Sequence, residues 1–128
     1  AHEYVGFFVG SPGMNFLNAS VVQEQCVVDG HAVGRCALAA GPCQLGFRPE
    51  WAQLAGTQGS SESALSAVIT GTRVLGTHRG ETFGWVDARV AGTSIVTRQP
   101  LAAVGEGPAQ LSFRDWRLFR DGWATGAG

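Results

Sequence analysis

The chain contains no lysine, because all nine of its basic residues are arginine. A P-loop needs lysine to reach nucleotide phosphates, and Schiff-base catalysis needs a lysine amine. Neither chemistry can therefore be carried by these 128 residues. The stretch GTRVLGTH at 71–78 has the glycine spacing of a P-loop, but Thr77 stands in the lysine position. We interpret this stretch as part of a strand.

Charge is scarce, since charged residues make up 15% of the chain and the formal net charge is −1. Nucleic-acid-binding domains usually carry a basic surface, so we expect no nucleic-acid partner. No apolar run approaches the roughly 20 residues that span a bilayer. The start has neither a basic leader nor an initiator methionine, so we expect a processed or excised piece of a longer protein.

Residues that carry catalysis or metal binding are few and scattered. The three cysteines form no C-x-x-C motif, so we expect reduced thiols in a core and no metal site. His2-Glu3 lacks the second histidine of a metalloprotease helix. The serines of the polar loop at 56–63 have no nucleophile-elbow context. We expect no catalytic residue and no cofactor site in this chain.

What the sequence does contain is 19 glycines between short apolar runs, which is typical of a β-rich domain with many turns. We predict about eight to ten short strands in an OB-like β-barrel or sandwich, with a hairpin turn at Asp29-Gly30 and another turn near 78–80. Cys43, Leu45 and Phe47 alternate with polar or small residues and indicate a strand. Residues 49–54 are predicted to form one short helix, since Pro49 suits a first helical turn. The tail after Asp121-Gly122 is expected to fray.

The first residues follow a different pattern. Tyr4, Phe7 and Phe8 have helical spacing, and Pro12 prevents a helix from continuing. We therefore expect 1–13 to be the end of a helix from a preceding domain together with an interdomain turn. Residues 14–126 are expected to form the β domain, with 54–63 as an internal boundary.

Near the other end, Arg114, Arg117 and Arg120 alternate with Asp115 and Asp121. We interpret them as local ion pairs or as an interaction face. An anion site is the weaker alternative. Exposed aromatics beside arginine favour partner surfaces, so Trp51 is also a candidate contact, although core packing is the ordinary role of tryptophan.

Three segments together resemble one family. FFVGSPGMNFLNASVV at 7–22 resembles the junction FIGSP-x-MNFL in ATP-binding subunits of carbohydrate ABC importers. LGFRPEWAQL at 45–54 resembles the family signature LGIRPEH-x-x-L, and GPAQLSFRDWRLFRDG at 107–122 is similar to the family's closing strand and turn. The landmarks occur in the family's order and extend over nearly the whole chain.

The resemblance implies a transport-associated OB (TOBE) regulatory domain, as in the maltose and glycerol-3-phosphate transporter ATPase subunits. It implies an upstream ATPase domain that uses ATP and Mg²⁺, a homodimer of such subunits, and membrane permease subunits. A regulatory protein is a further implied partner in some members. The implied location is the cytoplasmic face of the cell membrane. No catalytic motif of that family lies within this chain.

The motif residues that the resemblance singles out are expected to fix the interdomain turn, the first strand and a strand-to-helix corner: Ser11, Pro12, Met14, Asn15, Phe16, Gly46, Arg48, Pro49 and Glu50. An alternative places Arg48 or Trp51 at a subunit interface. A second function remains open, because related TOBE domains in molybdate systems bind oxyanions, which arginine and backbone N–H groups could hold. A single-strand nucleic-acid binder is the weakest hypothesis.

Overall fold

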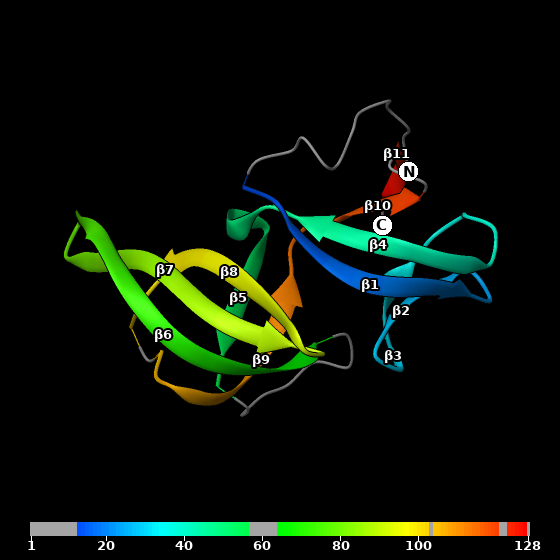
Figure 1. The fold of residues 1–128 in the computed structure, drawn as a ribbon. Helices are drawn as coiled ribbons and strands as arrows, with labels where there is room; N and C mark the ends of the chain where they lie inside the picture. Colours follow the sequence, from blue (N-terminus) through cyan, green and yellow to red (C-terminus); the bar gives the residue numbers. More distant parts are fainter. Residues whose placement is uncertain (1–12, 57–63, 103, 121–122, 128) are drawn as a thin grey trace.

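The protein is mostly β and OB-like, and consists of two antiparallel sheets joined by one short helical turn (Figure 1). This computed structural model describes residues 13–56, 64–102, 104–120 and 123–127. Of the proposed remnant helix and turn at 1–13, residues 1–12, with Ser11 and Pro12, lie outside the described residues. So do residues 57–63 of the polar loop and the Asp121-Gly122 turn.

The first sheet has the order β11-β10-β4-β1-β2-β3. Its strands are β1 (Asn15–Val22), β2 (Gln25–Val28), β3 (His31–Arg35), β4 (Gly41–Phe47), β10 (Arg117–Arg120) and β11 (Trp123–Ala127). Strand β4 is central, since it pairs with β1 on one side and β10 on the other. The two ends of the described chain therefore meet in one sheet.

The second sheet has the order β5-β9-β6-β7-β8 and curls into a half-barrel (Figure 1). Its strands are β5 (Ala52–Ala55), β6 (Leu65–His78), β7 (Glu81–Val90), β8 (Thr93–Pro100) and β9 (Gly107–Phe113). Register shifts at Ile69/Gly71 and Val74/Gly76 interrupt the β6–β7 ladder, and such bulges bend a strand. Beyond the curled part, the β6–β7 hairpin projects from the sheet with its tip exposed.

Tight hairpins connect most neighbouring strands. The predicted turn at Asp29-Gly30 is confirmed, with φ angles of 50° and 82°. Arg79-Gly80 and Ala91-Gly92 repeat this geometry, which is that of the two-residue turns favoured by twisted hairpins. Gln23-Glu24 also adopts positive φ at both residues although neither is glycine, so its sequence gives no turn signal.

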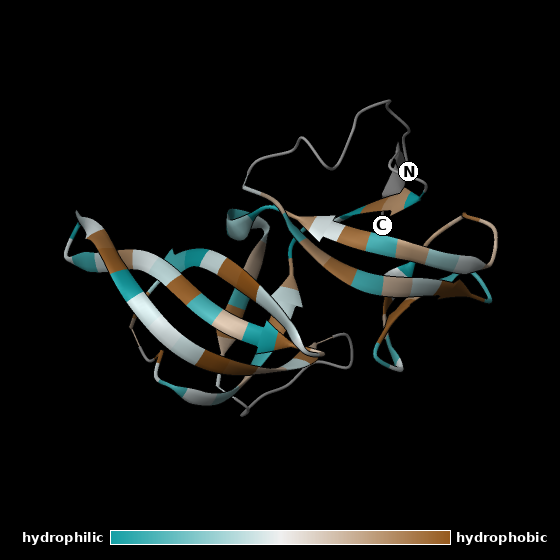
Figure 2. Ribbon diagram, viewed as in Figure 1, coloured by the Kyte–Doolittle hydropathy of each residue, from teal (hydrophilic) through white to brown (hydrophobic). Residues whose placement is uncertain are grey.

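Alternating residues from both sheets form one hydrophobic core (Figure 2). On β1, Leu17, Ala19 and Val21 point inward, and on β7 Val86, Ala88 and Val90 do so. The predicted alternation of Cys43, Leu45 and Phe47 is also confirmed, since all three are buried. The burial of every second residue is the alternation that a β-strand produces, as the sequence predicts.

A buried amide closes the half-barrel. Strands β5 and β8 are the two edges of the second sheet and do not pair with each other. Gln99 on β8, only 4% exposed, accepts from the Leu54 N–H at 2.7 Å and donates to the Leu54 carbonyl at 2.7 Å. Thr97 donates to the same Gln99 oxygen at 2.6 Å. One side chain thus satisfies backbone groups that a neighbouring strand would otherwise pair.

Two local predictions are wrong. The helix predicted at 49–54 is a 3-10 turn, η2 (Pro49–Trp51), followed directly by strand β5. Ala52 and Leu54 alternate inward and pair with β9, so sheet pairing overrides the helical start signal. The tail expected to fray forms β11 against β10. The described residues hold eleven strands, close to the eight to ten that the sequence predicts, and the fold class is confirmed.

Candidate functional site

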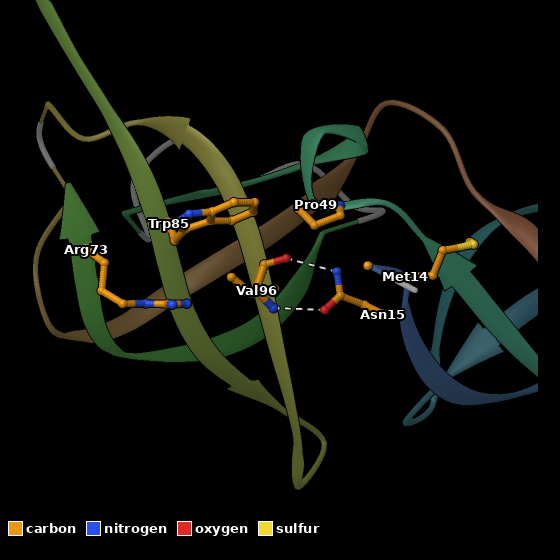
Figure 3. A pocket seen from close by; sticks show the side chains of 7 residues that line it. Met14, Asn15, Pro49, Arg73, Trp85 and Val96 are labelled. Carbon is orange, nitrogen blue, oxygen red and sulfur yellow. Dashed lines mark hydrogen bonds between the residues drawn. The ribbon is translucent and has the colours of Figure 1, made fainter. Parts of the chain in front are cut away.

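The junction between the two sheets gathers residues from two of the motif segments, 7–22 and 45–54. Asn15 begins β1 and faces inward, in register with Leu17. Its side-chain amide donates to the Val96 carbonyl at 2.9 Å and accepts from the Val96 N–H at 2.9 Å (Figure 3). The same amide nitrogen lies 3.4 Å from the Phe47 carbonyl of β4. Asn15 therefore links β1 and β4 of the first sheet to β8 of the second.

Two aromatic rings cover the face of the first sheet opposite to the Asn15 side chain. Phe16 and Phe119 meet edge to face, with ring centroids 5.4 Å apart. Gly46 lies beneath them, and a Cβ at this position would stand 2.7 Å from Phe119 and 2.9 Å from Phe16. The terminal carbon of Met14 would be 3.2 Å away. Glycine at this position lets β1, β4 and β10 bring their side chains together.

The predicted corner after β4 exists, although a strand follows it. Arg48 is extended, as expected for a residue before proline, and Pro49 is buried at the start of η2. The carboxylate of Glu50 lies 3.5 Å from the Arg48 guanidinium, with both side chains about half exposed. Such an exposed pair contributes little stability. Arg48 is thus on the surface, while Pro49 anchors the corner.

Trp51 is half-buried against the core, and the last turn before β10 wraps around it. The Trp51 carbonyl accepts from the Arg114 N–H at 2.6 Å, and the Arg114 side chain donates to the Glu50 carbonyl at 3.1 Å. The Arg117 guanidinium lies 5.2 Å from the Trp51 ring centroid and pairs with Asp115. Trp51 therefore holds the β4–β5 corner to the β9–β10 connection.

The arginine cluster predicted at the chain end is divided between two places. Arg114 and Arg117 meet at Trp51, but Arg120 donates to the carbonyls of Ala39, Gly41 and Pro42, at 2.9, 3.2 and 3.0 Å. Of the local ion pairs expected here, the described residues show Arg117–Asp115, whereas Arg114 and Arg120 bond to backbone carbonyls far away in the sequence. Trp116, between Arg114 and Arg117, is 6% exposed and packs in the core.

A cavity of about 310 Å³ opens beside the Asn15 bridge (Figure 3). Arg73 of β6 and Trp85 of β7 form one side of it, and they are register partners. The opposite side comes from the start of the described chain, from η2 and from β8, through Gly13, Met14, Asn15, Pro49 and Val96. The cavity thus lies where the outward face of the second sheet meets the motif residues of the first.

Arg73, which lines the cavity, is paired with Asp87, which is not itself a lining residue. The Arg73 guanidinium forms a two-point pair with the Asp87 carboxylate, with N–O distances of 3.1 and 2.9 Å. Side-chain exposure is 60% for Arg73 and 40% for Asp87, so solvent reaches both. Their charges cancel, which leaves a site that is neutral as a whole.

A thiol pair lies under the first sheet. Cys26 and Cys43 are buried and occupy the two strands that flank β1, opposite Val21 and Ala19. A hydrogen bond with Cys43, together with burial, raises the pKa of the Cys26 thiol well above its ordinary value. The same hydrogen bond and the nearby Arg120 guanidinium lower the pKa of Cys43 to about 7, against the effect of burial.

The thiols are free, as the sequence predicts. Within the described residues, no group of three or more histidine, cysteine or acidic side chains could hold a metal ion. In the same part of the chain, no helix is long and apolar enough to cross a bilayer.

Sequence reasoning missed the residues that carry the junction and cavity in the second sheet: Arg73, Trp85, Asp87, Val96 and Gln99. A signal for Gln99 was present, because it shares the inward register of β8 with Ile95 and Thr97. A polar amide at an inward strand position indicates a buried hydrogen-bonding role. Arg73 and Asp87 gave no signal, since their pairing depends on the β6–β7 register.

No protein-family model matches this chain, and no curated protein matches its sequence.

Proposed function

We propose that this chain is the regulatory β domain of the ATP-binding subunit of a carbohydrate-type ABC importer. One observation supports this most directly: residues from the three segments that resemble the family pack together at the start of β1. Met14 directly precedes β1 and Phe16 lies in it, Gly46 is the next-to-last residue of β4 beside them, and Phe119 of β10 completes the cluster. Residues 30 to 103 positions apart in the sequence thus share one packing cluster, as expected if the three segments form one motif set.

In this proposal the junction residues have structural roles, and the chemistry lies elsewhere. Asn15, Phe16, Gly46 and Pro49 join β1 to β4 and to the second sheet. ATP and Mg²⁺ bind an upstream ATPase domain. The β domain stabilises the homodimer of ATP-binding subunits, which is attached to permease subunits at the inner face of the membrane and receives a regulatory protein. Arg48 and Arg114 are exposed and are available for such contacts.

The alternative, an oxyanion-binding module, is less well supported by the cavity. An oxyanion site needs unpaired positive charge or converging N–H groups. The arginine that lines the cavity is already paired at two points with Asp87. An anion there would displace or repel that carboxylate.

The first test is the coding sequence that precedes Ala1. The proposal expects an in-frame ATPase domain with a Walker lysine, which this chain lacks. A gene that begins with an initiator codon immediately before Ala1 would contradict it.

The second test concerns the dimer. We expect the complete gene product to remain a dimer after ATP is removed, by light scattering coupled to gel filtration. A version ending before Ala1 is expected to dissociate under the same conditions. If both versions have the same mass with and without nucleotide, the chain has no dimer-stabilising role.

A further inference from the structure

The cavity beside the Asn15 bridge combines an aromatic surface with a paired donor and acceptor. Trp85 extends into it from the outward face of β7, and Arg73 runs beside it from β6 (Figure 3). Pro49 and Val96 add apolar surface on the other sides, while the Met14 side chain points away from the cavity (Figure 3). Its volume of about 310 Å³ is at the lower end of the range of roughly 300–1,000 Å³ found for small-molecule sites.

The indole of Trp85 determines which surface of a ligand can lie in the cavity. The face of an aromatic ring carries negative quadrupole density and attracts groups with partial positive charge. The C–H bonds on one face of a sugar ring are polarised by the neighbouring hydroxyl oxygens. Such a face is flat, weakly positive and of the size of an indole, and it gains dispersion contact as well.

The Arg73–Asp87 pair determines what the edge of the ligand must offer. After pairing, the guanidinium keeps N–H donors and the carboxylate keeps lone pairs, because each group has more positions than the two bonds use. A hydroxyl can both donate and accept, so adjacent hydroxyls can bond to both members of the pair. A free anion is repelled by the Asp87 carboxylate, and a free cation is repelled by the Arg73 guanidinium.

We propose that this cavity is a binding site for a neutral sugar ring, stacked on Trp85 and hydrogen-bonded at its edge to Arg73 and Asp87. Its floor includes Asn15 and Pro49, so an occupant touches the junction of the two sheets directly. This assignment rests on the cavity alone. It stands or falls separately from the proposed place of the chain in a transporter.

The test is isothermal titration of the 128-residue chain with glucose, maltose and glycerol, and in parallel with sulfate, phosphate and molybdate. We expect weak, high-micromolar to millimolar binding of at least one sugar and no heat with the anions. Amide NMR shifts on the sugar are expected at Trp85, Asp87 and Val96. Binding of anions alone, or no heat with any sugar at tens of millimolar, overturns the proposal.

Substitutions at the cavity test whether the sugar binds there. Trp85→Ala is expected to weaken sugar binding at least about tenfold, and Asp87→Asn several-fold, because each removes one of the two kinds of contact. Arg89→Ala is the matched control, since Arg89 is exposed on the same strand and its side chain bonds to Ser94 and Gly92, neither of which lines the cavity. Asp87 is half exposed, so Asp87→Asn keeps the test valid if Trp85→Ala does not fold. Unchanged affinity in both cavity variants places the sugar elsewhere and overturns the assignment.

Discussion

The side chain of Asn15 and the backbone of Val96 form a closed pair of hydrogen bonds, at 2.9 Å in each direction. Val96 is on β8, an edge strand of the second sheet, and Asn15 begins β1 of the first. An amide side chain presents one donor and one acceptor, as a backbone residue does. Asn15 therefore extends the hydrogen bonding of β8 across the junction without a continuous sheet.

Asn15→Asp is expected to destabilise the protein by about 2 kcal/mol, because it removes the donor and turns a carboxylate toward the Val96 carbonyl. Urea unfolding followed by circular dichroism measures the change. Asn18→Asp is the control, since Asn18 is exposed on the same strand and its side chain only accepts a 3.5 Å bond from Gln44. Equal stability of Asn15→Asp and the wild type would show that the bridge contributes nothing.

Gln99→Met keeps the volume of the side chain but leaves the Leu54 N–H and carbonyl without their partner. A buried unsatisfied group costs about 1–3 kcal/mol, so we expect a loss at or above the upper end of that range. Hydrogen exchange is expected to rise first at Leu54. Gln53→Met, on the exposed face of β5, is the matched substitution. A similar effect of the two changes would contradict the role of Gln99 in closing the half-barrel.

Gly46→Ala places a methyl group less than 3.0 Å from both Phe16 and Phe119. Overpacking of this kind costs about 1–3 kcal/mol. Gly76→Ala serves as the control, because a Cβ there meets nothing within 4 Å and Gly76 also lies in a strand. Thermal melting of the two variants side by side gives the comparison, and a Gly46→Ala protein as stable as Gly76→Ala would refute the aromatic closure.

Stability is expected to rise with pH between about 7 and the ordinary cysteine pKa, because Cys43 has its pKa lowered to about 7 in the folded protein. In this window the folded state has released a proton that the unfolded state still holds, so higher pH favours folding. This stabilisation is complete above the unfolded pKa and is lost as the pH falls through about 7. The raised pKa of Cys26 acts in the opposite direction above the ordinary cysteine value.

Urea midpoints at several pH values under reducing conditions test this dependence. Cys43→Ala is expected to remove the rise, and Cys36→Ala, at a half-buried thiol, is expected to keep it. A rise of equal size in Cys43→Ala would assign it to other groups.

The sequence predicted the strands and two of the turns well, because alternation and glycine carry those signals locally. Cys43, Leu45 and Phe47 alternate as predicted, and Asp29-Gly30 forms its hairpin turn. The segment 49–54 was mistaken for a helix, because Pro49 gives the same start signal to a single 3-10 turn. What decides its second half is pairing with β9, more than 50 residues away.

The sequence indicated only some of the residues of the candidate site. Asn15 and Gly46 were selected through a resemblance, but their partners Val96 and Phe119 depend on how the two sheets meet. Trp85 was visible as an aromatic residue, although its neighbour Arg73 is fixed by a register that includes two bulges. Such long-range register cannot be read from local periodicity.

The proposed function is tested most directly by ATP hydrolysis. We expect the complete gene product to hydrolyse ATP in the presence of Mg²⁺, and the isolated 128-residue chain, which has no lysine, to show no turnover above buffer. Phosphate release by both proteins at equal molar concentration is the measurement. Turnover by the isolated chain, or none by the complete gene product, would contradict the assignment of this chain as the regulatory domain of an ABC importer ATPase.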